Sequence, residues 1–219
     1  MNKVKYLIVF IIYLSIHGLA RAGAYEDFFE ALSRDEVAAV ERLLNRGFDP
    51  NSVNPEGVPA LMLALRTPAP RVALALAHAK GIRAEVRNDK DESVLMLAAL
   101  RGELALVKRL LEADADVNNP GWTPLHYAAS GGHAKVIETL LDAHAYIDAA
   151  SPNGTTPLMM AAMYGNVACV QILIDAGADL RLRNEQGLDA LAFAQRGQKT
   201  ASEALIRQVL QHLDQRPRS

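Results

Sequence analysis

The sequence predicts an all-α solenoid, in which helix-turn-helix units are joined by hairpin loops and stack one on the next. Two observations predict it. The stretch from Gly121 to Asp148 has the pattern of two short helices, and its landmarks return along the chain at nearly constant intervals. A unit of about thirty residues cannot bury its own apolar face, so it needs neighbours of the same design. A leucine at one landmark recurs with spacings of 34, 30, 33 and 33 residues, at Leu61, Leu95, Leu125, Leu158 and Leu191.

The stretch from 121 to 148 shows how one unit is built. Thr123-Pro124 starts the first helix, because the fixed φ of proline suits a first helical turn, and Gly131-Gly132 ends it after the small pair Ala128-Ala129. Apolar residues at helical spacing then define the second helix, at Val136, Ile137, Leu140 and Leu141. This string resembles one ankyrin repeat almost in full. The resemblance implies a curved stack with a concave side of hairpin tips and first helices, which proteins of this family use to bind other proteins.

Six such units are predicted, and the resemblance covers roughly residues 25 to 213. We expect an ankyrin-repeat domain over 23–213, whose first and last units are caps with more polar outer positions. Ser33 with Glu36, and Thr200 with Glu203, are expected to cap the helices that follow them. The tail 214–219 is expected to be disordered. The predicted units span 24–54, 55–88, 89–119, 120–150, 151–183 and 184–213.

The second unit departs from the pattern. Pro59-Ala60 replaces Thr-Pro, and Met62 stands where the resemblance places a histidine. Pro68 and Pro70 are expected in the loop between its two helices, where proline stiffens the chain without breaking a helix.

The hairpin before the fourth unit is short. Asn118 precedes the turn Gly121 by 3 positions, whereas Asp148 precedes Gly154 by 6. The sequence therefore predicts a tip that lacks three residues and leaves a notch in the row of hairpin tips.

The first 22 residues differ from the rest. Lys3 and Lys5 precede an apolar run from Tyr6 to Ile16, and Ala20-Arg21-Ala22 fits a small-x-small cleavage site. This pattern is typical of a secretory signal peptide, so we expect export to the periplasm with cleavage after Ala22. The alternative is an uncleaved anchor, although the run is short against the roughly 20 residues that a spanning helix needs.

Composition and motifs argue against nucleic-acid binding, metal binding and catalysis. The chain has a net charge of −2, which becomes more negative when the signal peptide and its three basic residues are removed, so a nucleic-acid-binding surface is not expected. The single cysteine, Cys169, has no disulfide partner and is expected to fill the core as a small, buried apolar residue. His126 is structural by the resemblance, tying its helix start to the neighbouring hairpin, and no histidine has metal-ligand spacing with a cysteine or carboxylate. Without a phosphate loop or nucleophile elbow, we expect no cofactor, no metal and no enzymatic activity.

Surface recognition remains. The positions that the resemblance places on the concave side include aromatic and arginine residues, the types enriched at interface hot spots. We expect an apolar strip of Trp122, Met163, Tyr164 and Leu188, rimmed by Arg101 and Arg196, with Leu100 and Thr155 beside it. The alternative for Trp122 is packing against the next hairpin. Tyr127, Met160 and Phe193 are expected in the core.

The predicted function is a monomeric, non-catalytic module that binds a protein partner of unknown identity. The concrete form that we favour protects or inhibits a secreted enzyme in the periplasm. The alternative is a membrane-tethered scaffold that keeps its N-terminal anchor.

Overall fold

The computed structural model describes residues 23–215, so the predicted signal peptide (1–22) and most of the predicted tail (216–219) lie outside the described residues. Within 23–215 the regular structure is helical, apart from isolated bridges between Val53 and Pro59 and between Arg87 and Ser93. The all-α prediction is confirmed. The chain divides into two compact units between Arg83 and Ala84, and each is built of helix pairs.

The first unit, described from residue 23, holds a helix over residues 23–33, α2 (Val37–Asn45), α3 (Ala60–Arg66) and α4 (Pro70–His78). Phe28 is fully buried in its core and lies against Phe48, with ring centroids 4.4 Å apart. Pro70 is the first residue of α4, where a missing N–H costs no helical hydrogen bond. The expectation that Pro70 lies between the helices is therefore wrong.

The expected capping box of Ser33 with Glu36 does not form. Ser33 Oγ donates instead to the carbonyl oxygen of Glu30 at 2.7 Å, and Glu36 precedes α2 without a side-chain cap. Asp35, which directly precedes Glu36, has a left-handed φ of 54°. Its carboxylate accepts a hydrogen bond of 2.8 Å from the N–H of Val72 in the first turn of α4. Asp35 therefore caps a helix of the next pair rather than the one that follows it.

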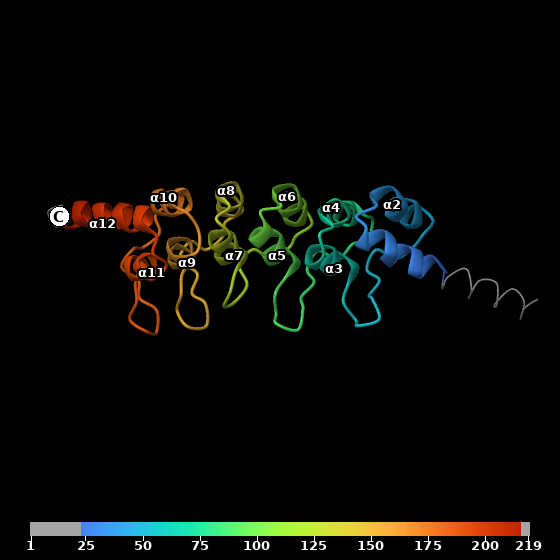
Figure 1. Cartoon of the computed structure of the whole chain (residues 1–219), viewed down its shortest axis with the longest axis horizontal. Coiled ribbons are helices and arrows are strands. Elements are labelled where there is room, and N and C mark those ends of the chain that lie inside the picture. The colour runs from blue at the N-terminus through green and yellow to red at the C-terminus, as the bar shows by residue number, and fades with distance from the viewer. Residues whose placement is uncertain (1–22, 216–219) are drawn as a thin grey trace, which may run out of the picture. The chain divides into compact units, whose positions relative to one another are not determined.

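The second unit arranges its helices in two rows (Figure 1). The first row, here called the inner helices, consists of α5 (Val94–Arg101), α7 (Pro124–Gly131), α9 (Pro157–Met163) and α11 (Ala190–Arg196). The second row, the outer helices, consists of α6 (Leu104–Glu112), α8 (Ala134–Asp142), α10 (Val167–Asp175) and α12 (Thr200–Asp214). Each inner helix packs on the next inner helix and on the outer helix that follows it. The hairpin loops project on the side of the inner helices (Figure 1).

Consecutive repeats approach so closely that Gly165 and Gly197 leave no room for a side chain. A Cβ added at Gly165 would lie 2.4 Å from the carbonyl oxygen of Ala129, and one at Gly197 would lie 2.4 Å from that of Met163. The small pairs Ala128-Ala129 and Ala161-Ala162 are fully buried beside them. Backbone atoms of one repeat thus touch the helix end of the repeat before it, which fixes the spacing of the inner helices.

The shortened hairpin before α7 is confirmed. Residues 113–123 connect α6 to α7, which makes 11 residues, whereas 143–156 and 176–189 make 14 each. The tip before α9 is closed by hydrogen bonds from Gly154 N–H to Ser151 O and from Ser151 N–H to Thr155 O, at 2.8 and 3.0 Å. Within 23–215 no equivalent backbone pair closes the loop before α7, which projects less than its neighbours in Figure 1.

The last helix begins differently from the prediction. Lys199 occupies the N-cap of α12, and Thr200 is already helical, so Thr200 does not cap this helix. Glu203 instead pairs with Arg207 one turn later at 2.5 Å. The helix runs through Asp214, into the segment expected to be disordered.

Candidate functional site

The predicted strip is divided between the two ends of the inner helices. Leu100, Arg101, Met163, Tyr164 and Arg196 lie where inner helices end and turn toward the outer row, and we call this set the turn-end row. Trp122 and Leu188 lie in the loops that lead into α7 and α11, and we call this pair the hairpin-end row. An inner helix of 8 residues, such as α7, is roughly 12 Å long, so the two rows form opposite borders of one face. We call this face the inner face.

Trp122 is the largest side chain of the hairpin-end row. It is 36% exposed, and its ring meets the buried ring of His126 edge-on, with centroids 5.2 Å apart. One edge of Trp122 thus packs inside its own repeat, and the remaining surface faces solvent. A tryptophan held in this way loses little freedom on binding, which suits an anchor residue.

His126 fixes the position of Trp122 and of the next hairpin. Its Nδ1 accepts a hydrogen bond from the backbone N–H of Thr123 at 3.1 Å, so the ring proton is on Nε2, which donates to the carbonyl oxygen of Thr155 at 2.9 Å. Burial of the ring lowers the pKa of His126 to about 4. The neutral imidazole thus joins two repeats, as the resemblance implied.

In the second unit, two other repeats have methionine at this position and make only half of the connection. Met96 Sδ accepts from Ser93 N–H at 3.3 Å, and Met159 Sδ accepts from Thr156 N–H at 3.4 Å. A thioether is a weak acceptor and has no proton to donate. In these repeats the side chain holds its own helix start but cannot reach the next hairpin as a donor.

The expectation that Thr155 contributes to the surface is wrong. Thr155 is only 2% exposed, its N–H donates to Ser151 Oγ at 3.0 Å, and its carbonyl accepts from His126. The full-length hairpin folds this position inward, because its backbone supplies the bonds that close the loop.

The turn-end row has the more exposed apolar surface. Tyr164 is 54% exposed and Leu100 is 38% exposed, while Met163 is half-buried. Arg101 and Arg196 are both exposed, and Arg196 donates to Gln186 Oε1 at 3.3 Å. Leu188, in the other row, is half-buried.

A series of donors beneath the turn-end row was missed in the sequence. His133 Nε2 lies 2.9 Å from Leu100 O, Asn166 Nδ2 donates to Gly132 O at 2.8 Å, and Lys199 Nζ donates to Tyr164 O at 3.5 Å. Each side chain binds the helix end of the preceding repeat, where carbonyl groups lack helical partners. The constant spacing of 33 between these three polar residues was the available signal.

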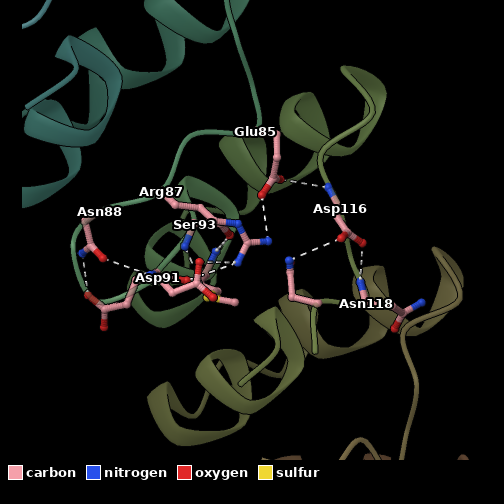
Figure 2. A network of polar contacts seen from close by, with 10 residues as sticks. Glu85, Arg87, Asn88, Asp91, Ser93, Asp116 and Asn118 are labelled. Atoms are coloured by element: carbon pink, nitrogen blue, oxygen red, sulfur yellow. Dashed lines mark hydrogen bonds and ion pairs between the residues drawn. The ribbon is translucent and has the colours of Figure 1, made fainter. Parts of the chain in front are cut away.

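A second series joins the bases of the hairpins. Glu85 accepts from the N–H of Asp116 at 3.1 Å, Asn118 from that of Tyr146 at 2.8 Å, and Asp148 from that of Asp179 at 3.1 Å. Figure 2 shows the first of these contacts, where Glu85 also pairs with Arg87 at 3.0 Å. These bonds hold each loop in register with the next, so the inner face is a rigid surface.

Tyr127 is a connector rather than a plain core residue. It is half-buried, and its hydroxyl donates to Glu92 Oε1 at 2.9 Å across the repeat boundary. Burial, and then Glu92, raise the pKa of Tyr127. Met160 is also half-buried, whereas Phe193, at 8% exposure, is in the core as expected.

From 23 to 215, no group of three or more histidine, cysteine or acidic side chains is arranged to hold a metal ion. Burial raises the pKa of Cys169, the opposite of what an activated thiol needs. No helix in the described part of the chain is long and apolar enough to cross a membrane.

Known proteins share this pattern. A family model for ankyrin repeats (three copies) matches residues 28–118, 72–151 and 143–215. The crystal structure of an ankyrin repeat domain from Acinetobacter baumannii AYE superposes with a TM-score of 0.69 at 25% identity, covering 81% of this chain and 94% of that one.

Two curated relatives are larger proteins. Ankyrin repeat and SAM domain-containing protein 6 of Danio rerio is 33% identical over 122 residues, covering 54% of this chain and 16% of that protein. The 2-5A-dependent ribonuclease of Mus musculus is 36% identical over 69 residues, covering 30% of this chain and 9% of the ribonuclease. The chain thus spans less than a fifth of either relative.

Proposed function

The chain belongs to the ankyrin-repeat family, and on that premise we propose that its inner face binds a protein partner without catalysing a reaction. Repeats of this kind are protein–protein interaction modules. One observation supports the choice of face: Trp122 and Tyr164 remain 36% and 54% exposed although both are fixed in position. Trp122 packs on His126, which bonds to the next hairpin, and the backbone carbonyl of Tyr164 accepts from Lys199.

The physical argument concerns rigidity and exposure. Large aromatic side chains that remain exposed to solvent on a folded domain are typical of a protein-binding surface. The two series of inter-repeat hydrogen bonds fix the backbone under both rows, so little order has to be gained on binding. The residues come from rigid helix ends and short loops, which is how repeat proteins present a binding surface.

We further propose that the module acts after export, in the periplasm, where it protects or inhibits a secreted enzyme. The N-terminal pattern of residues 1–22 supports export. The lone cysteine, Cys169, is buried, so a disulfide is not needed to hold the described residues together.

Affinity capture tests the proposal. The protein, purified from cells that express the full chain, is used as bait in a periplasmic extract beside a variant with Trp122→Ala and Tyr164→Ala. Tyr146→Ala is the matched control, because Tyr146 is 67% exposed and lies in neither row. We expect one protein to be captured by the wild type and the control and lost by the double variant. Equal capture by all three would contradict the proposal.

Two measurements test the finer statements. The N-terminal residue of the purified protein is expected to be Gly23, and an intact Met1 would favour the tethered scaffold instead. If the captured protein is an enzyme, its activity is measured with and without the module, and an unchanged rate and lifetime would exclude protection and inhibition.

A further inference from the structure

The two borders of the inner face carry opposite charge. Beside the hairpin-end row, residues 85–92 hold four carboxylates and two basic side chains. Residues 183–189 hold two carboxylates and one basic side chain. At the turn border, the exposed Arg101 and Arg196 and the half-exposed Lys199 outnumber Glu103 and Glu203. Of these two acids, Glu203 already pairs with Arg207 at 2.5 Å. A chain with a net charge of −2 thus presents a positive border along one side of its inner face.

Apolar surface lies between the cations of this border. Leu100 is next to Arg101 on α5, and Tyr164 follows Met163 at the end of α9. Lys199 Nζ donates to the backbone carbonyl of Tyr164. Between these two places, α7 ends in Ser130-Gly131, whose small side chains leave room for a polypeptide backbone.

The positive charges fit the helix ends as well as a ligand. Cations at a helix C-terminus complement the helix dipole. That role does not account for the exposed Tyr164 and Leu100, because neither residue adds charge to a helix end. A ligand for this row must match both its positive charge and its exposed apolar side chains. A segment that alternates acidic and apolar side chains does so.

We propose that the turn-end row binds an extended acidic segment of the protein partner, with carboxylates on Arg101 and Arg196 and apolar side chains on Leu100 and Tyr164. This inference rests on the proposed function and names the chemistry of the partner. From α5 to α11 there are three inner-helix spacings of roughly 8–10 Å each. An extended segment of about eight or nine residues covers that length.

Binding of labelled peptides tests the charge preference. Three probes of about nine residues share the same leucine and phenylalanine positions and carry glutamate, glutamine or lysine between them. Fluorescence anisotropy with the protein purified from cells expressing the full chain is expected to show the glutamate probe binding roughly tenfold more tightly than the glutamine probe, and the lysine probe most weakly. Added salt is expected to narrow this difference. Equal binding of all three probes, or no binding of the glutamate probe, would overturn the proposal.

Variants separate the turn-end row from general charge. Arg101→Gln with Arg196→Gln is expected to abolish the preference for glutamate over glutamine, while Tyr164→Ala weakens all three probes alike. Lys108→Gln is the control, since Lys108 is exposed on α6 in the outer row. The unfolding midpoint of the arginine variant is measured in parallel. A charge preference that survives in a folded arginine variant would show that the cations serve only the helix ends.

The capture experiment distinguishes this inference from the proposed function. A partner lost with Trp122→Ala but retained with Arg101→Gln and Arg196→Gln would leave the proposed function standing and overturn the inference. A partner retained by all of these variants would overturn both.

Discussion

His126 Nε2 donates to the carbonyl oxygen of Thr155, 2.9 Å away in the next repeat, while its Nδ1 accepts from Thr123 N–H, and this second bond requires a neutral ring. Burial lowers the pKa of His126 to about 4, below its ordinary value of 6.5. Between pH 6.5 and about 4, His126 is therefore protonated in the unfolded chain and neutral in the folded chain. The stability that depends on neutral His126 is fully present above pH 6.5 and is lost as the pH falls to about 4.

We therefore predict that His126 makes the protein sensitive to mild acid. The shift corresponds to at most about 3 kcal/mol between the two ends of this range. Urea unfolding of the wild type and of His126→Met at pH 7 and pH 4.5 measures it, with the difference between the two proteins isolating this residue. His126→Met is expected to lose about 1–3 kcal/mol at pH 7, because Thr155 O loses its donor from the preceding repeat and keeps only Ser151 N–H, and to lose less on acidification. Parallel pH profiles for the two proteins would show that His126 does not carry the effect.

A second prediction concerns the contact between repeats at Gly165. Gly165→Ala would place a Cβ 2.4 Å from Ala129 O, which is backbone and cannot move aside alone. We expect a loss of about 3 kcal/mol or more in the free energy of unfolding. Gly187→Ala is the control, since Gly187 has a φ of 73° and nothing near its Cβ, so only backbone strain of about 1 kcal/mol is expected. Equal losses in the two variants would mean that the repeats can separate at little cost.

The thiol of Cys169 provides a third prediction. It is fully buried in α10, and burial raises its pKa, so little thiolate is accessible in the folded protein. Labelling with a thiol reagent at pH 8 is expected to be slower than in the urea-unfolded protein by about a hundredfold or more, because reaction waits for local opening. Comparable rates in the two states would show that α10 opens freely. A Cys169→Ala variant, which cannot be labelled, gives the background.

The fold could be predicted from sequence because its signals are repeated. The Thr-Pro start, the Ala-Ala pair and the glycine stop are local requirements, and their register fixed the helix pairs, the short hairpin before α7 and the role of His126. The predicted helix caps were wrong where a side chain forms its hydrogen bond outside its own helix, as Asp35 does with Val72.

The site was predicted less well, because exposure depends on neighbouring repeats. Trp122 and Thr155 occupy equivalent positions after a turn glycine, yet one is exposed and the other buried. The difference arises from the loop: only the full-length hairpin has Ser151 to bond the backbone at this position. The bases of the hairpins use Glu85, Asn118 and Asp148 for one role, and such mixed residue types hide a shared function from a pattern search.

The last prediction follows from that mixture. Asn118 both accepts from Tyr146 N–H and donates from Nδ2 to His144 O at 2.9 Å, whereas Asp148 can only accept. Burial, opposed by the hydrogen bond from Asp179 and reinforced by the charge of Asp179, raises the pKa of Asp148. Because the folded pKa lies above the unfolded one, folding is penalised wherever Asp148 is ionised, and the penalty disappears as the pH falls below the ordinary value of 3.8.

Asp148→Asn should therefore stabilise the protein. The amide keeps the acceptor, removes the half-buried charge and can donate to the next hairpin as Asn118 does, for a gain of about 0.5–1.5 kcal/mol at pH 7. The gain should shrink near pH 3.5, since the aspartate is then largely protonated in both states. The reverse change, Asn118→Asp, should destabilise by a similar amount at pH 7, because it removes the donor to His144 O and introduces a charge. Urea unfolding of both variants at the two pH values measures these effects. Stabilisation by Asp148→Asn that is the same at both pH values would show that the charge of Asp148 is not its cause.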